Sequence, residues 1–362
     1  MRAVAALAAA EGVTLVIPTV GRPSLGAVLS ALAADPPPSV PFEVIVVDDR
    51  RTPGPPLTVP PALSAYARVV CGSGRGPAAA RNVGWRAARH PWVAFLDDDV
   101  VPDHGWVAAL LTDLDVPDRV GGVQGRVQVP LPAGRRPTDW ERGTAGLAGG
   151  KWITADMAYR RAALAAVGGF DERFPRAFRE DAELAHRVRR AGWQLVRGER
   201  AVTHPVRPEN RWVSLRTQRG NADDALLRRM YGRDWRRTVD VPPGRRPRHV
   251  AVTAAGLAAL GCAVAALTGP ARTRRAWKVT GSAAGAAWLA GTAEFAVARV
   301  APGPRTPAEV TTMVLTSAAI PPLAVAHWLR GWWQTRGAAA QSVAQQAVTR
   351  QPVTQRPVPS GR

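Results

Sequence analysis

Cysteine is scarce in this chain, which has only Cys71 and Cys262 among its 362 residues. Two cysteines so far apart provide neither a metal-binding spacing nor a disulfide framework. The sequence also has no Gly-Lys-Ser/Thr phosphate loop and no dinucleotide-binding glycine fingerprint, which excludes two common nucleotide-binding motifs. The low cysteine content is typical of a reducing compartment.

Negative charge is scarce as well. The chain has 28 Asp and Glu residues against 48 Lys and Arg, nearly all of them Arg, and its formal net charge is +20. This balance favours anionic partners such as nucleic acid, sugar nucleotides or anionic lipid, although an Arg-rich proteome would give the same excess. Hydrophobic residues make up 46% of the chain, which is too many for a disordered protein.

The N-terminus shows no secretory signal. Residues 1–10 form a run that is too short and too weakly apolar for a signal peptide, and the polar Glu11 follows at once. We therefore expect the N-terminal domain to be cytoplasmic.

Short apolar runs alternate with helical patterns in the first half of the chain. Strands are predicted at 13–17, 42–47, 69–70 and 92–96, and helices at 25–34 and 78–88. This alternation predicts an α/β domain with a mostly parallel sheet. Strands at 120–129 and 152–158, a loop at 130–150 and helices at 181–191 and 211–230 are expected to follow.

The domain boundaries follow from composition. We expect a catalytic domain over 1–240, a Pro/Arg linker at 241–248, Ala-rich hydrophobic helices over 249–333 and a disordered tail over 334–362.

Three apolar stretches in the last third, 250–268, 279–298 and 310–326, lie near the lower length limit for a membrane span of about 20 residues. Arg and Trp residues at their edges resemble interfacial anchors, so we expect transmembrane helices, with a packed Ala-rich bundle as the alternative. The cationic loop around Arg272 and Arg275 opposes the positive-inside tendency if the catalytic domain is inside, so the number and topology of spans stay open.

Acidic residues follow two of the predicted strands. Asp97, Asp98 and Asp99 come directly after the apolar run at 92–96, and Asp48 and Asp49 follow the run at 44–47. Ligands of α/β sheets bind beyond the carboxyl ends of strands, so both groups are expected in one cleft. Adjacent carboxylates after a buried strand call for a cation, and oxygen ligands suit magnesium or manganese. The alternatives are an acidic loop or a helix cap.

Three further features bear on chemistry. The Gly-rich turn at 72–84 leads into a helix, where backbone amides with Arg75 or Arg81 can meet phosphate. Asp181 opens a predicted helix, either as a cap or as a general base. His204 is either structural or part of a metal site with the carboxylates.

In this order the segments resemble the family 2 glycosyltransferases of the GT-A fold, over about residues 13–231. The resemblance rests on the runs at 16–19, 46–49, 76–84, 95–99, 158–161, 168–171 and 180–181. It implies a nucleotide-diphosphate sugar donor, transfer with inversion to a hydroxyl acceptor, and a divalent metal, magnesium or manganese.

The resemblance also implies roles for individual residues. Asp181 would be the catalytic base. The residues expected to bind the donor are Pro18, Arg22, Asp48, Asp49, Arg81, Asn82, Asp97 and Asp98. The residues expected to bind the metal are Asp97, Asp99 and His204. Those expected on the acceptor side are Asp156, Glu180 and Arg187. Asp156 stands where relatives often carry a small or amide residue, and which two of the three consecutive acids bind metal stays open.

The expected partners are a nucleotide-diphosphate sugar, a hydroxyl acceptor of the lipid-linked or cell-envelope glycan class, and the membrane, with the catalytic domain on the cytoplasmic side. Nucleic acid is not expected. Two alternatives stay open: a nucleotidyltransferase on a similar scaffold, and a basic nucleic-acid-binding protein, which would cluster Arg with aromatic residues on one surface.

Overall fold

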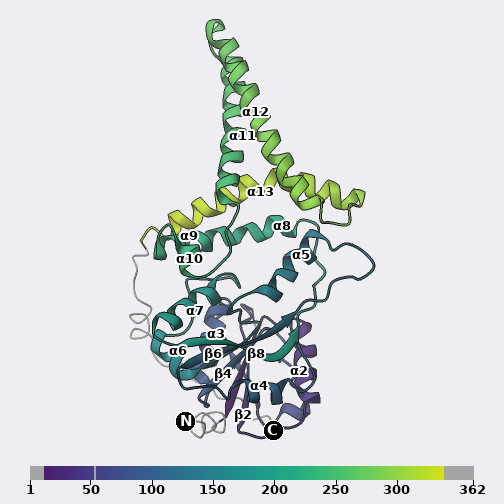
Figure 1. Cartoon of the computed structure of the whole chain (residues 1–362), viewed down its shortest axis with the longest axis vertical. Coiled ribbons are helices and arrows are strands. Elements are labelled where there is room, and N and C mark those ends of the chain that lie inside the picture. The colour runs from purple at the N-terminus through teal and green to yellow at the C-terminus, as the bar shows by residue number, and fades with distance from the viewer. Residues whose placement is uncertain (1–11, 53, 338–362) are drawn as a thin grey trace.

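The computed structural model describes residues 12–52 and 54–337, which form an α/β domain with a long helical hairpin projecting from it (Figure 1). The strands are β1 Val13–Thr19, β2 Phe42–Asp48, β3 Ala67–Cys71, β4 Trp92–Leu96, β5 Val101–Pro102, β6 Val120–Gln128, β7 Asp156–Arg160 and β8 Gln194–Thr203. The helices are α2 Ser24–Ala34, α3 Pro77–Ala87, α4 Trp106–Asp113, α5 Asp139–Ala145, α6 Arg161–Val167, α7 Glu180–Arg190, α8 Val213–Arg216, α9 Asn221–Tyr231, α10 Trp235–Thr238, α11 Arg246–Thr268, α12 Ala271–Val300 and α13 Pro307–Gln334.

The strands form one sheet in the order β3-β2-β1-β4-β7-β6-β8-β5. The first four strands are parallel, whereas β7 is antiparallel to both β4 and β6, and β5 is antiparallel to β8. The predicted α/β class is confirmed, with a more mixed second half than expected. The chain order reverses between β1 and β4, so the carboxyl ends of these two strands form the switch point at which α/β sheets bind ligands.

Helices cover both faces of the sheet, which is why the central strands read as continuous apolar runs rather than alternating ones. On one face Leu15 and Val44 pack with Leu29 of α2. On the other face Val16 and Ile45 pack with residues of α3, α6 and α7. This core fixes the ends of β1, β2 and β4, and with them the acidic residues that follow.

Several sequence-based boundaries were wrong. The stretch 130–150, expected as loop, contains α5, which begins with a capping box between Thr138 and Glu141. The strand expected at 152–158 begins only at Asp156, and β8 was missed. Helix α11 begins at Arg246, inside the predicted linker. The helix predicted at 211–230 is divided into α8, a 3₁₀ turn over Thr217–Gly220, and α9.

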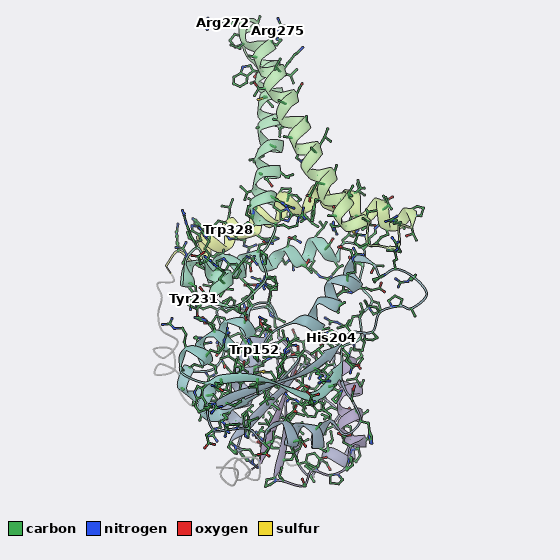
Figure 2. The ribbon with its side chains drawn as sticks, viewed as in Figure 1. Trp152, His204, Tyr231, Arg272, Arg275 and Trp328 are labelled. Atoms are coloured by element: carbon green, nitrogen blue, oxygen red, sulfur yellow. The ribbon has the colours of Figure 1, made fainter. Side chains whose placement is uncertain are left out.

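The three apolar stretches are all helical. Helices α11 and α12 pair as the projecting hairpin, and α13 lies across its base and packs against α9 (Figure 1). Among the described residues, α11 and α13 are long and apolar enough to cross a membrane by length and composition. Figure 2 shows Arg272 and Arg275 at the far tip of the hairpin, well away from the sheet. The tail predicted to be disordered lies, from residue 338, outside the described residues.

The hairpin is fixed to the α/β domain through α5. The buried guanidinium of Arg299, near the end of α12, donates to Asp139 at 2.7 Å and to Thr316 of α13 at 2.7 Å. Arg142 of α5 donates in turn to the backbone carbonyl of Arg299 at 2.8 Å. A buried ion pair of this kind is costly to break from one side, so α5, α12 and α13 form one packed unit.

Candidate active site

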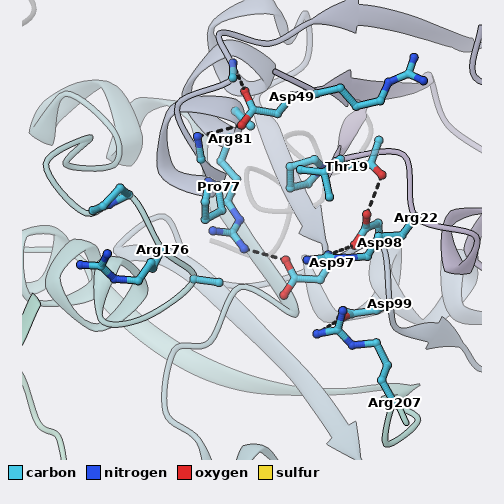
Figure 3. Close-up of a pocket in the computed structure, with 18 of the residues that line it drawn as sticks. Thr19, Arg22, Asp49, Pro77, Arg81, Asp97, Asp98, Asp99, Arg176 and Arg207 are labelled. Atoms are coloured by element: carbon cyan, nitrogen blue, oxygen red, sulfur yellow. Dashed lines mark hydrogen bonds and ion pairs between the residues drawn. The ribbon is translucent and has the colours of Figure 1, made fainter. Parts of the chain in front are cut away.

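A cleft of about 880 Å³ opens beyond the carboxyl ends of β1, β2 and β4. Its floor is made by Pro18 and Thr19 at the end of β1 and by the three aspartates after β4, which Figure 3 shows with their partners. The opposite wall comes from α5, from the loop before α7 and from the segment after β8. The sheet therefore brings the two acidic groups of the sequence together.

The two acids after β2 have different roles. Asp49 is buried and lines the cleft, and its two carboxylate oxygens accept hydrogen bonds from the amides of Gly74 and Gly76 at 2.7 and 2.8 Å. Asp48 instead pairs with Arg50 at 2.6 Å and does not line the cleft. Gly76 has φ +102°, and any side chain there would collide with the carbonyl of Pro175. Asp49 thus shapes the glycine-rich turn that begins α3.

Each of the three consecutive aspartates has its own partners. Asp97 accepts from the guanidinium of Arg81 at 2.6 Å. Asp98, almost fully buried, accepts from the Thr19 hydroxyl at 2.6 Å and from Arg22 at 2.5 Å, which ties the ends of β1 and β4 together.

Asp99 faces the imidazole of His204 at 3.6 Å and the guanidinium of Arg207 at 3.3 Å. Burial, followed by the charge of Asp97, raises the pKa of the Asp99 carboxyl.

The donor set around Asp99 fits a divalent ion that is shared with a nucleotide. The carboxylate of Asp99 and Nε2 of His204 supply one oxygen and one nitrogen on the cleft wall. Within residues 12–52 and 54–337 no three His, Cys, Asp or Glu side chains are arranged as a complete metal cage. Magnesium at phosphate sites is held by one or two carboxylates together with substrate phosphates and water, so a complete protein cage is not required.

A buried ion-pair chain leads from the aspartates to α7. Arg81, almost fully buried, bridges Asp97 and Glu180, with 3.0 Å to the latter. Burial alone would lower the pKa of Arg81, but these two carboxylates raise it above its ordinary value. Burial also raises the pKa of Glu180 and of Asp181, which are neighbours in the chain. Asp181 is partly buried, and one of its oxygens accepts from the amide of Ala182 at 2.7 Å.

The start of α7 is held in an unusual backbone conformation. Arg179 has φ +79°, a left-handed conformation that costs a residue with a side chain about 1–3 kcal/mol. Its guanidinium donates to Asp224 of α9 at 2.9 Å and lies over the ring of Phe178 at 4.3 Å. These contacts offset the strain and fix the direction in which Glu180 and Asp181 leave the loop.

Comparison with known proteins agrees with this geometry. The chain matches the family model described as glycosyl transferase family 2 over residues 14–168. Residues 14–168 are therefore similar to glycosyl transferase family 2. The matched region carries most of β1, the glycine-rich turn, the three consecutive aspartates after β4 and all of α6.

Curated relatives are similar over part of their length. The pre-mycofactocin glycosyltransferase of Mycobacterium tuberculosis is 33% identical over 164 residues, which cover 41% of this chain and 34% of that protein. The hyaluronan synthase of Pasteurella multocida is 32% identical over 116 residues, 29% of this chain and 12% of that one. The chain thus matches about a third or less of the length of these relatives.

Solved structures resemble this chain at low identity. A mannosyltransferase from Pyrobaculum calidifontis, in complex with GDP-Man and Mn²⁺, has a TM-score of 0.49 and 19% identity, and the match covers 88% of this chain and 86% of that one. TarS residues 1–349 of S. aureus, in complex with UDP-GlcNAc, has a TM-score of 0.42 and 13% identity over 90% and 92% of the two chains.

Six of the expected site residues do not line the cleft: Asp48, Asn82, Asp156, Glu180, Asp181 and Arg187. Asn82 is buried, donates to the Phe170 carbonyl at 2.8 Å and thereby holds the loop before α7. Asp156 is fully buried and pairs with Arg200 at 2.7 Å, which places it inside the domain rather than on an acceptor surface. Arg187 pairs with Glu183 one turn earlier on α7, at 2.7 Å.

Sequence reasoning missed two residues on the opposite wall. Trp140 of α5 lines the cleft, and its indole nitrogen donates to the backbone carbonyl of Arg207 at 2.8 Å. The side chain of Arg207 then reaches Asp99. The one available signal was the capping box, in which Thr138 is followed three residues later by Glu141 within the stretch expected as loop.

We expect Asp49→Ala to weaken donor binding at least about tenfold, because two charge-assisted hydrogen bonds to the glycine-rich turn are lost. Calorimetric titration of the nucleoside diphosphate would measure this. Asp35→Ala is the matched control: Asp35 also accepts from two backbone amides, those of Gly105 and Val107, but it does not line the cleft, so its loss should leave affinity unchanged. Equal losses for both variants would contradict the assignment of the turn to Asp49.

Proposed function

We propose that this protein transfers a sugar from a nucleotide-diphosphate donor to an acceptor hydroxyl, with inversion at the anomeric carbon and with the help of a divalent ion. The observation that carries the proposal is the position of Asp97, Asp98 and Asp99 on the floor of one large cleft, facing the glycine-rich turn and the loop before α7. The family match supports the same chemistry.

The donor is proposed to lie across the strand ends. Its nucleoside would contact the turn held by Asp49, and its diphosphate would lie between Arg81 and the aspartates. Asp99 and His204 would hold magnesium or manganese there, with Asp97 nearby. When bound, the ion offsets the negative charge that develops on the departing diphosphate.

The acceptor hydroxyl is proposed to lose its proton to Asp181 as its oxygen attacks the sugar carbon opposite the leaving group. A raised pKa suits a base, because the carboxylate then binds the proton more tightly. Glu180 engages Arg81 and so positions the buried cation rather than the acceptor. A single displacement with one base gives inversion.

A nucleotidyltransferase on the same scaffold is the main alternative. It would attack phosphorus and release pyrophosphate, whereas a glycosyltransferase releases a nucleoside diphosphate. Two incubations with manganese separate the two, one with UDP- and GDP-sugars and one with a nucleoside triphosphate and a sugar phosphate, and chromatography identifies the released nucleotide or pyrophosphate in each. Release of a nucleoside diphosphate supports glycosyl transfer, and release of pyrophosphate from a nucleoside triphosphate with a sugar phosphate supports the alternative.

We further propose that the α11–α12 hairpin anchors the enzyme in a membrane, with the catalytic domain in the cytoplasm. Leu257, Leu260 and Leu267 of α11 are exposed although they are strongly apolar, and the helix, at about 1.5 Å per residue, matches a bilayer core about 30 Å thick. The third apolar helix, α13, packs against α9 and is proposed to lie along the surface.

Replacing residues 256–288 by a short Gly/Ser linker should convert the protein from a membrane-bound to a soluble form. Gly256 and Trp288 face each other across the hairpin, so the cut ends are close and Arg299 keeps its place on α5. Flotation of cell membranes on a density gradient measures the outcome. If the full-length chain stays in the soluble fraction without detergent, the helices form a packed bundle instead.

A further inference from the structure

A second cavity, of about 410 Å³, lies beside the donor cleft. Its walls are α5, the segment 206–214 after β8, and the first turns of α13, where Thr312 and Met313 contribute. A cavity of this volume can hold a small ligand such as one sugar ring. It lies between the catalytic domain and the C-terminal helices, which meet at α5 and α13 (Figure 1).

The two cavities share a wall. Trp140 and Arg207 line both of them. Trp140 donates to the Arg207 carbonyl, and the Arg207 guanidinium lies 3.3 Å from Asp99. A molecule in the second cavity is therefore separated by a single layer of side chains from the carboxylate that we assign to the metal.

The lining of the second cavity differs in charge from that of the donor cleft. It contains four acids and two arginines, Asp139, Glu141, Glu209, Glu309, Arg207 and Arg211. The donor cleft has the opposite excess, with six arginines and four aspartates. In a chain of net charge +20, an acid-rich lining goes against the overall composition.

Three of the four acids are not free charges. Asp139 pairs with Arg299, Glu141 with Arg135 and Glu209 with Arg216, and none of these arginines lines the cavity. The lining is therefore close to neutral and rich in hydrogen-bond acceptors, and it offers no surplus positive charge for a phosphate. Carboxylate oxygens that already accept from one arginine keep lone pairs with which to accept from ligand hydroxyls.

An unused hydrogen-bonding group also lines this cavity. The hydroxyl oxygen of Ser214 is buried and has no hydrogen-bond partner in the part of the chain that the structure describes. A buried hydroxyl without a partner costs free energy, and a ligand hydroxyl in the cavity would remove that cost. The ring of Trp140 adds an apolar face of the kind against which a sugar ring can pack.

We propose that the second cavity is the acceptor site and that it takes a neutral, hydroxyl-rich group, such as a sugar residue, rather than a phosphate. The acceptor hydroxyl would pass the Trp140–Arg207 wall to reach the donor sugar. The C-terminal helices then have a second role, since α13 completes this site and Arg299 holds α5 against it. This inference rests on the proposed glycosyl transfer, which can fail independently of it.

The test compares three activities of the full-length protein in detergent with manganese. Hydrolysis of the nucleotide sugar without acceptor reports the donor cleft, and transfer to the methyl glycosides of glucose, mannose and galactose reports the acceptor site. The 6-phosphates of these glycosides report any preference for phosphate. Absence of donor hydrolysis would count against the proposed function itself.

Ser214→Trp should fill the second cavity and lower transfer to the accepted methyl glycoside at least about tenfold, with donor hydrolysis unchanged. Ser214→Val removes only the hydroxyl and should lower transfer about threefold to tenfold, which covers the case in which the larger variant fails to fold. Thr217→Trp, on the exposed turn that follows, is the matched control and should change neither activity. Unaltered transfer in a folded Ser214→Trp variant, no transfer to any neutral glycoside, or preference for the phosphorylated glycosides would each overturn the proposal.

Discussion

Asp181→Asn should lower glycosyl transfer by roughly 100-fold or more, the size of effect that general-base catalysis usually supplies, while nucleotide-sugar binding stays near the wild-type value. Asn preserves the shape of the side chain and its hydrogen bond from the Ala182 amide, but it cannot take a proton. The donor is proposed to lie against the glycine-rich turn and the aspartates, and Asp181 does not line that cleft, so donor affinity should not depend on Asp181.

The structural alternative for Asp181 makes the opposite prediction. If the side chain only caps α7, Asn serves as well as Asp, and the rate and melting temperature should both be nearly unchanged. Glu180→Gln is an informative comparison, because Glu180 bonds Arg81 at 3.0 Å and its loss should reduce donor affinity as well as rate. Near wild-type transfer by Asp181→Asn would remove this residue from the mechanism.

The pH dependence of transfer should follow the ionisation of the base. Burial raises the pKa of Asp181, and only its ionised form accepts a proton. Activity should therefore be high above that pKa and fall as the pH decreases through it, at a higher pH than an ordinary aspartate near 4 would give. A rate that stays constant down to the ordinary aspartate range would contradict this role.

Removing divalent ions should abolish nucleotide-sugar turnover, with a loss of roughly 100-fold or more, because metal-ion stabilisation of a leaving group is worth several kcal/mol. Manganese or magnesium added after the chelator should restore activity. The clustered aspartates would otherwise repel the diphosphate, which is why we expect little residual rate. Full turnover in excess chelator would contradict the metal role.

Variants of the proposed ligands locate the ion. Asp99→Asn and His204→Ala should each raise the manganese concentration needed for half-maximal activity. The Asp99 carboxylate and the His204 imidazole lie 3.6 Å apart on the cleft wall, so both are placed to bind one ion. Asp98→Asn should act differently, since its carboxylate ties Thr19 to Arg22 and its loss should lower the melting temperature. Titration of activity with manganese distinguishes these cases, and an unchanged requirement in Asp99→Asn would move the ion to Asp97.

Much of the catalytic domain was predictable because its signals are local. Buried parallel strands must be continuous apolar runs, so β1, β2 and β4 could be placed within two residues, and the acids after them follow from the rule for strand ends. The glycine-rich turn and the start of α7 were predictable for the same reason. Each is a short segment whose residue types point to its backbone conformation.

What could not be predicted depends on contacts between distant segments. Asp48 and Asp49 are equivalent in sequence, and only the packing of the glycine-rich turn gives Asp49 the cleft position. In the sequence Asp156 is a polar residue with no visible partner. In the structure its charge is neutralised by Arg200, 44 positions later. Helix α5 lies in a Pro- and Gly-rich stretch, and its place beside the cleft depends on Arg299 of the C-terminal hairpin.

The measurement that tests glycosyl transfer most directly is the identity of the products. Purified full-length protein is incubated with manganese, an accepted nucleotide sugar and an acceptor, and the nucleotide and the new glycosidic bond are analysed by chromatography and NMR. We predict a nucleoside diphosphate and a product whose anomeric configuration is opposite to that of the donor, both lost with Asp181→Asn. Release of a sugar phosphate or of a nucleoside monophosphate, or a product that keeps the donor's configuration, would contradict a single displacement at carbon in this cleft.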